Sequence, residues 1–117
     1  PNGQIPVRYS AAMYPLYKGG AVTNGSLHLM RLWKQVLRVD GVSLKTEAGT
    51  CDVTMTVDGA AAGSTYSVSA TASNQTFGTI IQIDAVTVGK SIDFTITNAD
   101  SACVGLQVSL STATAII

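Results

Sequence analysis

The chain has 117 residues, enough for one domain with a substantial core but not for two. Apolar residues make up 46% and charged residues only 12%, about half the usual share of charge, and serine and threonine fill much of the gap. This composition excludes a disordered tail and favours a compact all-β protein. No run approaches the roughly 20 apolar residues that a membrane-spanning helix requires, so we expect no membrane insertion.

The net charge of zero is unevenly divided along the chain. Residues 1–46 hold six basic residues and one acidic residue, a net charge of +5, whereas residues 47–117 hold one basic and six acidic residues, a net charge of −5. Two interpretations stay open: the halves pack against each other within one domain, or opposite patches dock neighbouring copies. The basic residues are scattered rather than clustered, so we expect no nucleic-acid partner.

Residues 1–26 differ from the rest because prolines and glycine pairs punctuate them. A flexible linker would not carry as much apolar surface as this segment does. We therefore predict an extended N-terminal arm that either folds back on its own domain or lies along a neighbour. The residues expected to make assembly contacts are Tyr9, Met13, Tyr14, Leu16 and Tyr17.

Residues 27–39 fit two patterns. Their apolar side chains recur at helical spacing with basic side chains opposite, and from Trp33 onwards they also alternate as in a strand. We predict a strand over about 33–45, with a bulge or bend at Asp40-Gly41 where the apolar phase switches. For residues 27–33, helix and strand both stay open.

The rest of the chain consists of short segments in which apolar residues alternate with Ser, Thr and Asp. Turn signals such as Asp58-Gly59 and Val88-Gly89 separate them. We therefore predict an antiparallel, jelly-roll-like β-sandwich of about 6–8 strands over residues 27–117. The expected strands after residue 45 lie at about 50–57, 65–72, 77–83, 91–97 and 106–111.

The sequence contains no recognisable catalytic or metal site. His28 is the one histidine and has no cysteine or carboxylate at a ligand spacing beside it, so we expect a structural role. The aspartates lack the dense spacing that a calcium loop needs. Neither a nucleophile elbow nor a phosphate-binding glycine loop occurs. We therefore predict a protein that is not an enzyme and that uses no cofactor or metal.

The two cysteines, Cys51 and Cys103, are separated by 51 residues. If their strands are neighbours, a disulfide between them is geometrically feasible and would be worth about 2–4 kcal/mol. In a reducing cytosol they would instead be two small buried thiols. Both states stay open.

Three stretches carry a resemblance to a known family: LRVDGVSLKTEAGTCDVTMTVDG, AVTVGKSIDFTITNAD and GLQVSLS. Over residues 33–111 they resemble the small β-sandwich modules of tailed-bacteriophage virion proteins, particularly tail-fibre type surface proteins. The turn and core positions of those modules are matched here by Gly49-Thr50, Asp58-Gly59, Val88-Gly89 and Gly105-Leu106. Because these are turn and core residues, the resemblance specifies a fold better than a role.

The resemblance implies a structural protein of the virion, made in the host cytoplasm and located in the particle. The expected role is a tail-fibre-type surface component that assembles through its N-terminal arm with other virion proteins. Trimers are expected by analogy with fibre proteins. The alternatives are a capsid decoration (cement) protein and a carbohydrate-binding β-sandwich module that touches a host-surface glycan. The last is disfavoured by the scarcity of aromatic residues on the predicted polar faces.

Overall fold

The computed structural model describes residues 8–71 and 73–116, with side chains described for 12–71, 75 and 81–113. Within these residues it contains strands only: β1 (Arg8–Ala21), β2 (Gly25–Leu32), β3 (Val36–Lys45), β4 (Cys51–Val57), β5 (Ala60–Val68), β6 (Ser73–Asp84), β7 (Lys90–Thr97) and β8 (Val104–Ile116). No helix long and apolar enough to cross a membrane is found in the described part of the chain.

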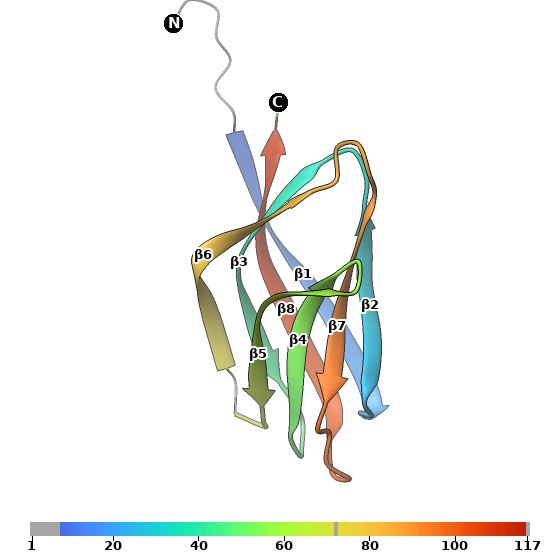
Figure 1. Ribbon diagram of the computed structural model, residues 1–117. Helices are drawn as coiled ribbons and strands as arrows, with labels where there is room; N and C mark the ends of the chain where they lie inside the picture. The colour runs from blue at the N-terminus through green and yellow to red at the C-terminus, as the bar shows by residue number, and fades with distance from the viewer. Residues whose placement is uncertain (1–7, 72, 117) are drawn as a thin grey trace, which may run out of the picture.

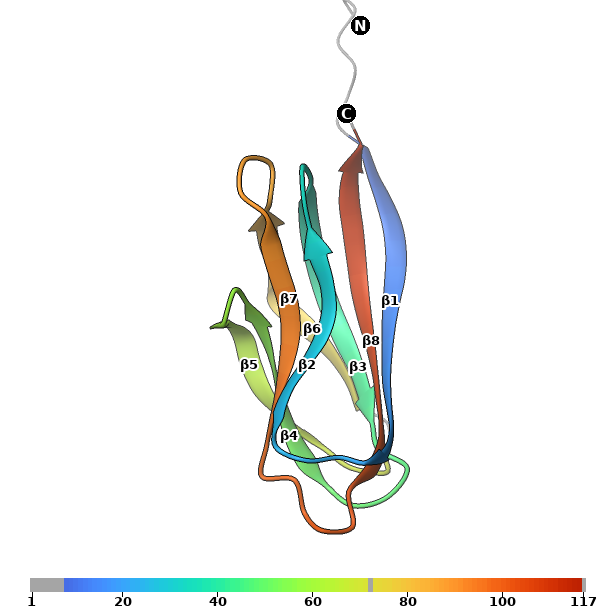
Figure 2. The same ribbon diagram turned by 90° about the vertical axis from the view of Figure 1, so that its right-hand side faces the viewer.

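The strands form two antiparallel sheets of four strands each, with the orders β1-β8-β3-β6 and β2-β7-β4-β5. The sheets face each other as the two layers of a sandwich (Figures 1 and 2). This distribution of consecutive strands between two sheets is that of an eight-stranded jelly roll. The predicted all-β sandwich is therefore confirmed.

The core lies between the two sheets, and strict alternation of buried and half-exposed residues builds it. Strand β7 shows the pattern clearly, because Ile92, Phe94 and Ile96 are buried while the residues between them face outwards. Each fully buried side chain of this size stabilises the fold by about 1.5–3 kcal/mol. The other fully buried large side chains come from both sheets: Leu32, Leu37, Val39, Leu44, Val53, Val68, Leu106 and Leu110.

The structure corrects the predicted boundary between arm and sandwich. Residues 8–21 are strand β1, which pairs with β8 from Arg8 to Ala21, so the sandwich begins well before residue 27. The prolines and glycines misled the prediction because β1 is an edge strand. Pro15 lacks an N–H group, and an edge strand has a free side where no N–H is required. Residues 1–7 of the predicted arm lie outside the described part of the chain.

The region that fitted both helix and strand is a strand, β2, which ends at Leu32. The predicted strand over 33–45 begins three residues later than expected, because the chain turns at Lys34, whose φ is 58°. Trp33 consequently lies at the turn with 53% of its surface exposed instead of facing the core. The bulge predicted at Asp40 is confirmed, since the register of β3 shifts between Val39 and Gly41 against both of its neighbours.

The turn predicted at Asp58-Gly59 is confirmed and closes the β4–β5 hairpin. Val57 pairs with Ala60, and the two turn residues have φ values of 51° and 85°, as in a type I′ turn. Strand β5 therefore starts directly at Ala60 and ends at Val68, earlier than the predicted 65–72.

Candidate functional site

The residues expected to make assembly contacts divide between the two faces of β1. Met13 and Tyr17 lie on its outer face, 57% and 56% exposed, whereas Tyr14 and Leu16 are half-buried and pack against the core. The backbone of Tyr9 belongs to β1, but its side chain lies outside the described ones. Two of the five residues are therefore available on the surface, and two contribute to the fold of their own domain.

Tyr17 makes a hydrogen bond that the sequence did not indicate. Its hydroxyl donates a hydrogen bond to Glu47 Oε1 at 2.8 Å. This hydrogen bond, followed by burial and the charge of Glu47, raises the pKa of Tyr17. The Glu47 side chain in turn lies over Gly105, where an added Cβ would come within 2.3 Å of its carboxyl carbon. Glu47 thus contacts both Tyr17 of β1 and Gly105 of β8.

Cys51 and Cys103 are both buried free thiols in the structure. They lie next to each other although β4 and β8 belong to different sheets. Burial is the main cause that raises the pKa of the Cys51 thiol to about 12, and contact with Cys103 raises it further. A thiol with so high a pKa is a poor nucleophile at neutral pH. A disulfide between the two remains a prediction.

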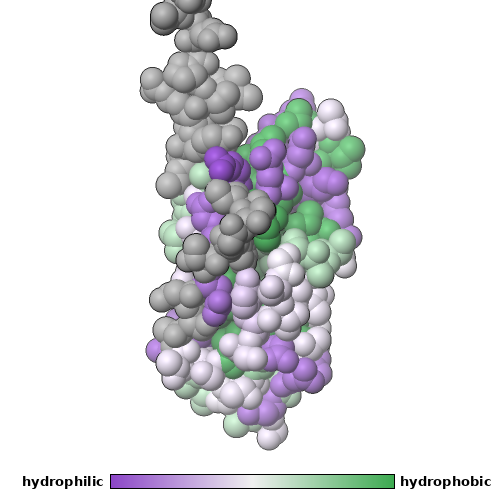
Figure 3. Space-filling model, turned by 60° about the vertical axis from the view of Figure 1, so that its left-hand side comes forward, coloured by the Kyte–Doolittle hydropathy of each residue, from purple (hydrophilic) through white to green (hydrophobic). Residues whose placement is uncertain are grey.

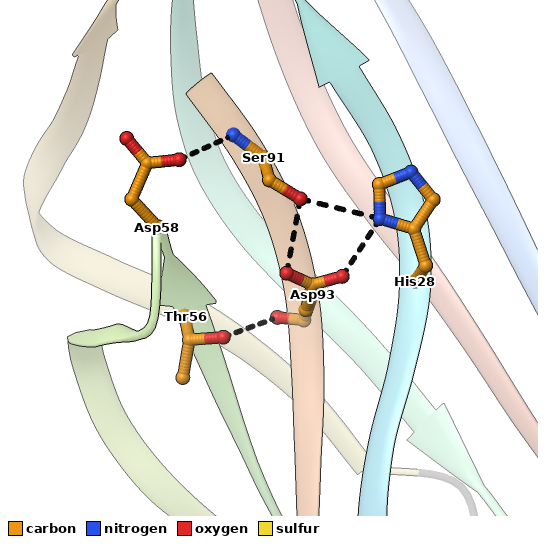
Figure 4. A network of polar contacts seen from close by, with 5 residues as sticks. All are labelled: His28, Thr56, Asp58, Ser91 and Asp93. Carbon is orange, nitrogen blue, oxygen red and sulfur yellow. Dashed lines mark hydrogen bonds and ion pairs between the residues drawn. The ribbon is translucent and has the colours of Figure 1, made fainter. Parts of the chain in front are cut away.

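A polar cluster that includes His28 lies on the outer face of the other sheet (Figure 4). His28 Nδ1 lies 2.7 Å from Asp93 Oδ1 and 3.2 Å from Ser91 Oγ, and the Ser91 hydroxyl donates to Asp93 Oδ2 at 3.1 Å. Asp58 Oδ1 accepts a hydrogen bond of 2.8 Å from the backbone N–H of Ser91. The cluster ties β2, β7 and the β4–β5 turn together.

The geometry of this cluster does not support nucleophilic catalysis, although it contains serine, histidine and aspartate. In a catalytic triad the carboxylate and the serine contact opposite nitrogens of the imidazole ring, so that the serine proton can pass through the ring. Here both Asp93 and Ser91 contact Nδ1, and the serine hydroxyl donates to the carboxylate. Thr56 also donates to the backbone oxygen of Asp93 at 3.3 Å. We assign the cluster a structural role.

Among the described residues, no group of three or more His, Cys, Asp or Glu side chains is placed to hold a metal ion. The ion pairs of the described residues do not add a metal-binding group either. Lys90 Nζ lies 3.8 Å from Asp58 Oδ2, a partly exposed contact that contributes little to stability.

An apolar hollow of about 350 Å³ opens between the β4–β5 hairpin and β6. Val57, Ala62, Ile81 and Ile83 line it, with polar side chains including Lys90 at its rim. Figure 3 looks onto this side of the molecule and shows hydrophobic side chains, in green, among polar ones. The hollow is shallow and open, with no convergent set of polar groups that would orient a small ligand.

Two smaller depressions lie on the outer face of the sheet β1-β8-β3-β6. One has a volume of about 230 Å³ and is lined by residues that include Met13, Asp40 and Ser111; the other, of about 170 Å³, includes Lys45 and Gln107. Ser43 belongs to both depressions. Small side chains, Gly41, Ser109 and Ser111, contribute to their lining, where the sequence predicted only alternating polar residues.

Sequence reasoning also missed an apolar tip at the end of the sandwich. Trp33 follows β2, and the exposed Val86 and Val88 lie in the loop between β6 and β7. The two loops are joined by backbone hydrogen bonds, from Lys34 N to Ala85 O at 2.7 Å and from Ala85 N to Gln35 O at 2.9 Å. The mixed phase of residues 27–39 was the only signal that could have placed Trp33 outside the core.

No family model and no curated protein matches this sequence. Among solved structures, the chain is similar to a chain in the structure of infectious bursal disease virus, Gx strain. The TM-score is 0.56 at 14% identity, covering 96% of this chain and 33% of that one. A chain in the structure of the Gt strain of the same virus gives a TM-score of 0.42 at 14% identity over 93% of this chain and 33% of that one, too low to carry an argument.

The similarity to the Gx strain chain establishes a shared fold. This chain spans about one third of the length of the chain that it matches. The similarity is to a protein of a virus, as the sequence resemblance implied, but it does not confirm a tail-fibre module of a tailed bacteriophage.

Proposed function

We propose that this protein is a non-enzymatic structural component of a virus particle. The observation that carries the proposal is the eight-stranded jelly roll, whose arrangement is similar to a chain found in a virus structure. The one Ser-His-Asp cluster of the described residues supports the proposal. Its serine and aspartate contact the same nitrogen of His28, so the cluster links neighbouring strands and does not have the geometry of a catalytic triad. The protein would be made in the host cytoplasm and be located in the virion.

Within the virion, we favour a tail-fibre-type surface component that acts as a homo-oligomer and contacts other virion proteins. The support is the presence of two large exposed side chains, Met13 and Tyr17, on the outer face of β1. The segment predicted to be an extended arm would then act as an edge strand that presents assembly residues. The analogy with fibre proteins predicts that this homo-oligomer is a trimer.

Capsid decoration is the alternative role. Its supporting observation is that the similar chain comes from the structure of a virus particle, and a compact sandwich fits a protruding decoration as well as a fibre. The carbohydrate-binding alternative gains no support. Exposed Tyr17 and Trp33 lie near opposite ends of the sandwich, on β1 and after β2, and form no continuous aromatic platform.

The test is to look for the chain in purified particles of the virus that encodes it. We expect quantitative mass spectrometry to find it at a fixed copy number per particle. Immunogold labelling with antibodies against the recombinant protein would place it on tail fibres or on the shell, which separates the two roles. Particles that lack the chain, purified from cells that contain it, would overturn the proposal.

A further inference from the structure

Small side chains occupy the central rows on the outer face of β3 and β8. Gly41 pairs with Ser111, and Ser43 pairs with Ser109. Sheets that pack face to face lie about 10 Å apart, and side chains as small as these do not hold a second sheet further away.

Charged residues of alternating sign lie along β3 and just after its end, on both sides of Ser43. Arg38 and Asp40 lie on one side of Ser43 and have an outward, half-exposed phase; Lys45 and Glu47 lie on the other side and are exposed. The order of signs is therefore positive, negative, then positive, negative. Among the described residues, neither Asp40 nor Lys45 forms an ion pair.

Reversing the strand direction about Ser43 makes this order complementary to itself. A two-fold axis that lies in the plane of the contact, perpendicular to the strands, reverses the strand direction in the second copy. If it passes over Ser43, Asp40 of each copy faces Lys45 of the other. Arg38 of each copy then lies at the same end of the contact as Glu47 of the other copy, and the two side chains carry opposite charges.

The same axis also matches the exposed apolar residues of β1. Pro15 pairs with Ser109, the residue that pairs with Ser43, so Pro15 and Ser43 lie in one row across the sheet. Rotation about that row brings Met13 of one copy opposite Tyr17 of the other. A methionine sulfur next to an aromatic ring is a favourable contact of about 0.3–1.5 kcal/mol.

Contact through the free edge of β1 is less favourable than contact through this face. Pro15 lies in the middle of β1 and has no N–H to donate to an added strand. Antiparallel pairing of two β1 strands about Met13 would also place Arg8 beside Lys18 of the other copy, which is a repulsion of like charges. The edge is thus protected in the way that natural sheets avoid edge-to-edge aggregation.

We propose that this face is the two-fold contact surface for a second copy of the chain, with ion pairs between Asp40 and Lys45 and contacts between Met13 and Tyr17. The contact is independent of the virion role, but it occupies Met13 and Tyr17, so a trimer of the full chain would have to form through another part of the surface. Three strands spaced by about 4.8 Å and paired over about eleven residues span on the order of 500 Å². This is less than the roughly 800 Å² per partner of a standard interface, so we expect a weak, reversible dimer.

The experiment is sedimentation velocity on the full chain from about 1 μM to about 500 μM, at low and at high salt. The expected result is a monomer–dimer equilibrium that salt weakens, because the ion pairs are partly exposed. Asp40→Lys and Lys45→Asp each place like charges opposite each other twice in the dimer, and each should weaken dimerisation at least tenfold. The double variant Asp40→Lys/Lys45→Asp restores opposite charges and should dimerise like the parent.

The matched control is Lys34→Asp, which makes the same charge change at an exposed turn position away from this face. It should dimerise like the parent. Circular dichroism on every variant verifies that the fold is retained. A monomer at all concentrations, a trimer without dimer, or single and double variants that dimerise equally would overturn the proposal. None of these outcomes depends on whether the chain is found in a virion, so the two proposals fail separately.

Discussion

At the scale of single residues, close approach of backbone explains why particular turn glycines are required. Gly49 has a φ of 73°, and a Cβ at this position would lie 2.3 Å from Cys103 N and 2.5 Å from the carbonyl carbon of Ala102. The contacted atoms are backbone, so they cannot move aside as a flexible side chain would. Gly59 has a φ of 85° but no atom within 4 Å of the same position.

These two glycines provide a matched pair of substitutions. Gly59→Ala should cost about 1 kcal/mol, the penalty for placing a Cβ in the left-handed region. Gly49→Ala should cost about 3 kcal/mol or more, because the steric clash with the 102–103 backbone is added. Urea denaturation of both variants measures the difference. Equal losses would show that the chain around Cys103 can move away without cost.

The buried thiol of Cys51 predicts a dependence of stability on alkaline pH. Burial raises its folded-state pKa from 9.0 to about 12. A raised pKa contributes stability that is fully present below the unfolded pKa and is lost as pH rises towards the folded pKa. The free energy of unfolding of the reduced protein should therefore fall between about pH 9 and pH 12, because the unfolded chain releases the proton first.

Cys51→Ala isolates this effect from the titration of tyrosines and lysines. The variant should lose stability less steeply above pH 9 than the parent, although it is less stable at neutral pH because of the cavity. Chemical denaturation at a series of pH values gives both slopes. Parallel slopes in the reduced proteins would contradict the assignment, and thiol titration of the oxidised protein would show whether the predicted disulfide with Cys103 forms.

At the scale of elements, β1 shows how an edge strand can carry residues that a central strand would not tolerate. Its inner face contributes Tyr14 and Leu16 to the core, and its last residue leads to Val22, whose N–H donates to Cys103 O at 2.9 Å. Its outer face presents Met13 and Tyr17. The same strand thus closes the sandwich and provides a contact surface.

Removal of residues 1–21 should therefore abolish cooperative unfolding, because the core loses its cover and the β8 edge is exposed. Met13→Ser, a change on the outer face of the same strand, should shift the melting temperature by less than about 3 °C, since exposed substitutions rarely exceed 0.5 kcal/mol. Thermal denaturation followed by circular dichroism compares the two. A truncated chain that melts like the parent would show that residues 8–21 are not needed for the fold of the sandwich.

At the scale of the whole molecule, the topology brings distant parts of the chain together. Strand β1 pairs with β8, and the Thr112 hydroxyl donates to Ala12 O, across a separation of 100 residues. In the sheet β1-β8-β3-β6, strands of the basic half of the chain alternate with strands of the acidic half. This arrangement favours the interpretation that the unequal charge of the two halves is balanced within one domain, while Asp40 and Lys45 remain available for contacts between copies.

The long-range pairing also predicts slow folding. Loops must close before most strand contacts can form, so we expect refolding in milliseconds to seconds rather than microseconds. Stopped-flow dilution from urea, followed by the fluorescence of Trp33, measures the rate. Refolding within the dead time of such an instrument would indicate that local hairpins, such as β4–β5, dominate the transition state.

The local pattern of the sequence determined the fold class, most strands and several turns. Alternation in β4, β7 and β8 predicted those strands, Asp58-Gly59 predicted the hairpin, and the switch of phase at Asp40 predicted the bulge. These signals are readable because they depend on neighbours one or two positions apart, where side chains alternate between two faces.

The tertiary structure alone decided which strands are partners. It placed β1 in the sandwich, turned Trp33 outwards, brought Cys51 next to Cys103, and set Ser91 and Asp93 on the same nitrogen of His28. It also aligned Pro15, Ser109 and Ser43 in the row about which the charges of the outer face become complementary. None of this is encoded in local periodicity, because pairing depends on the free energy of contacts between residues far apart in the sequence, and those contacts exist only once the chain is folded.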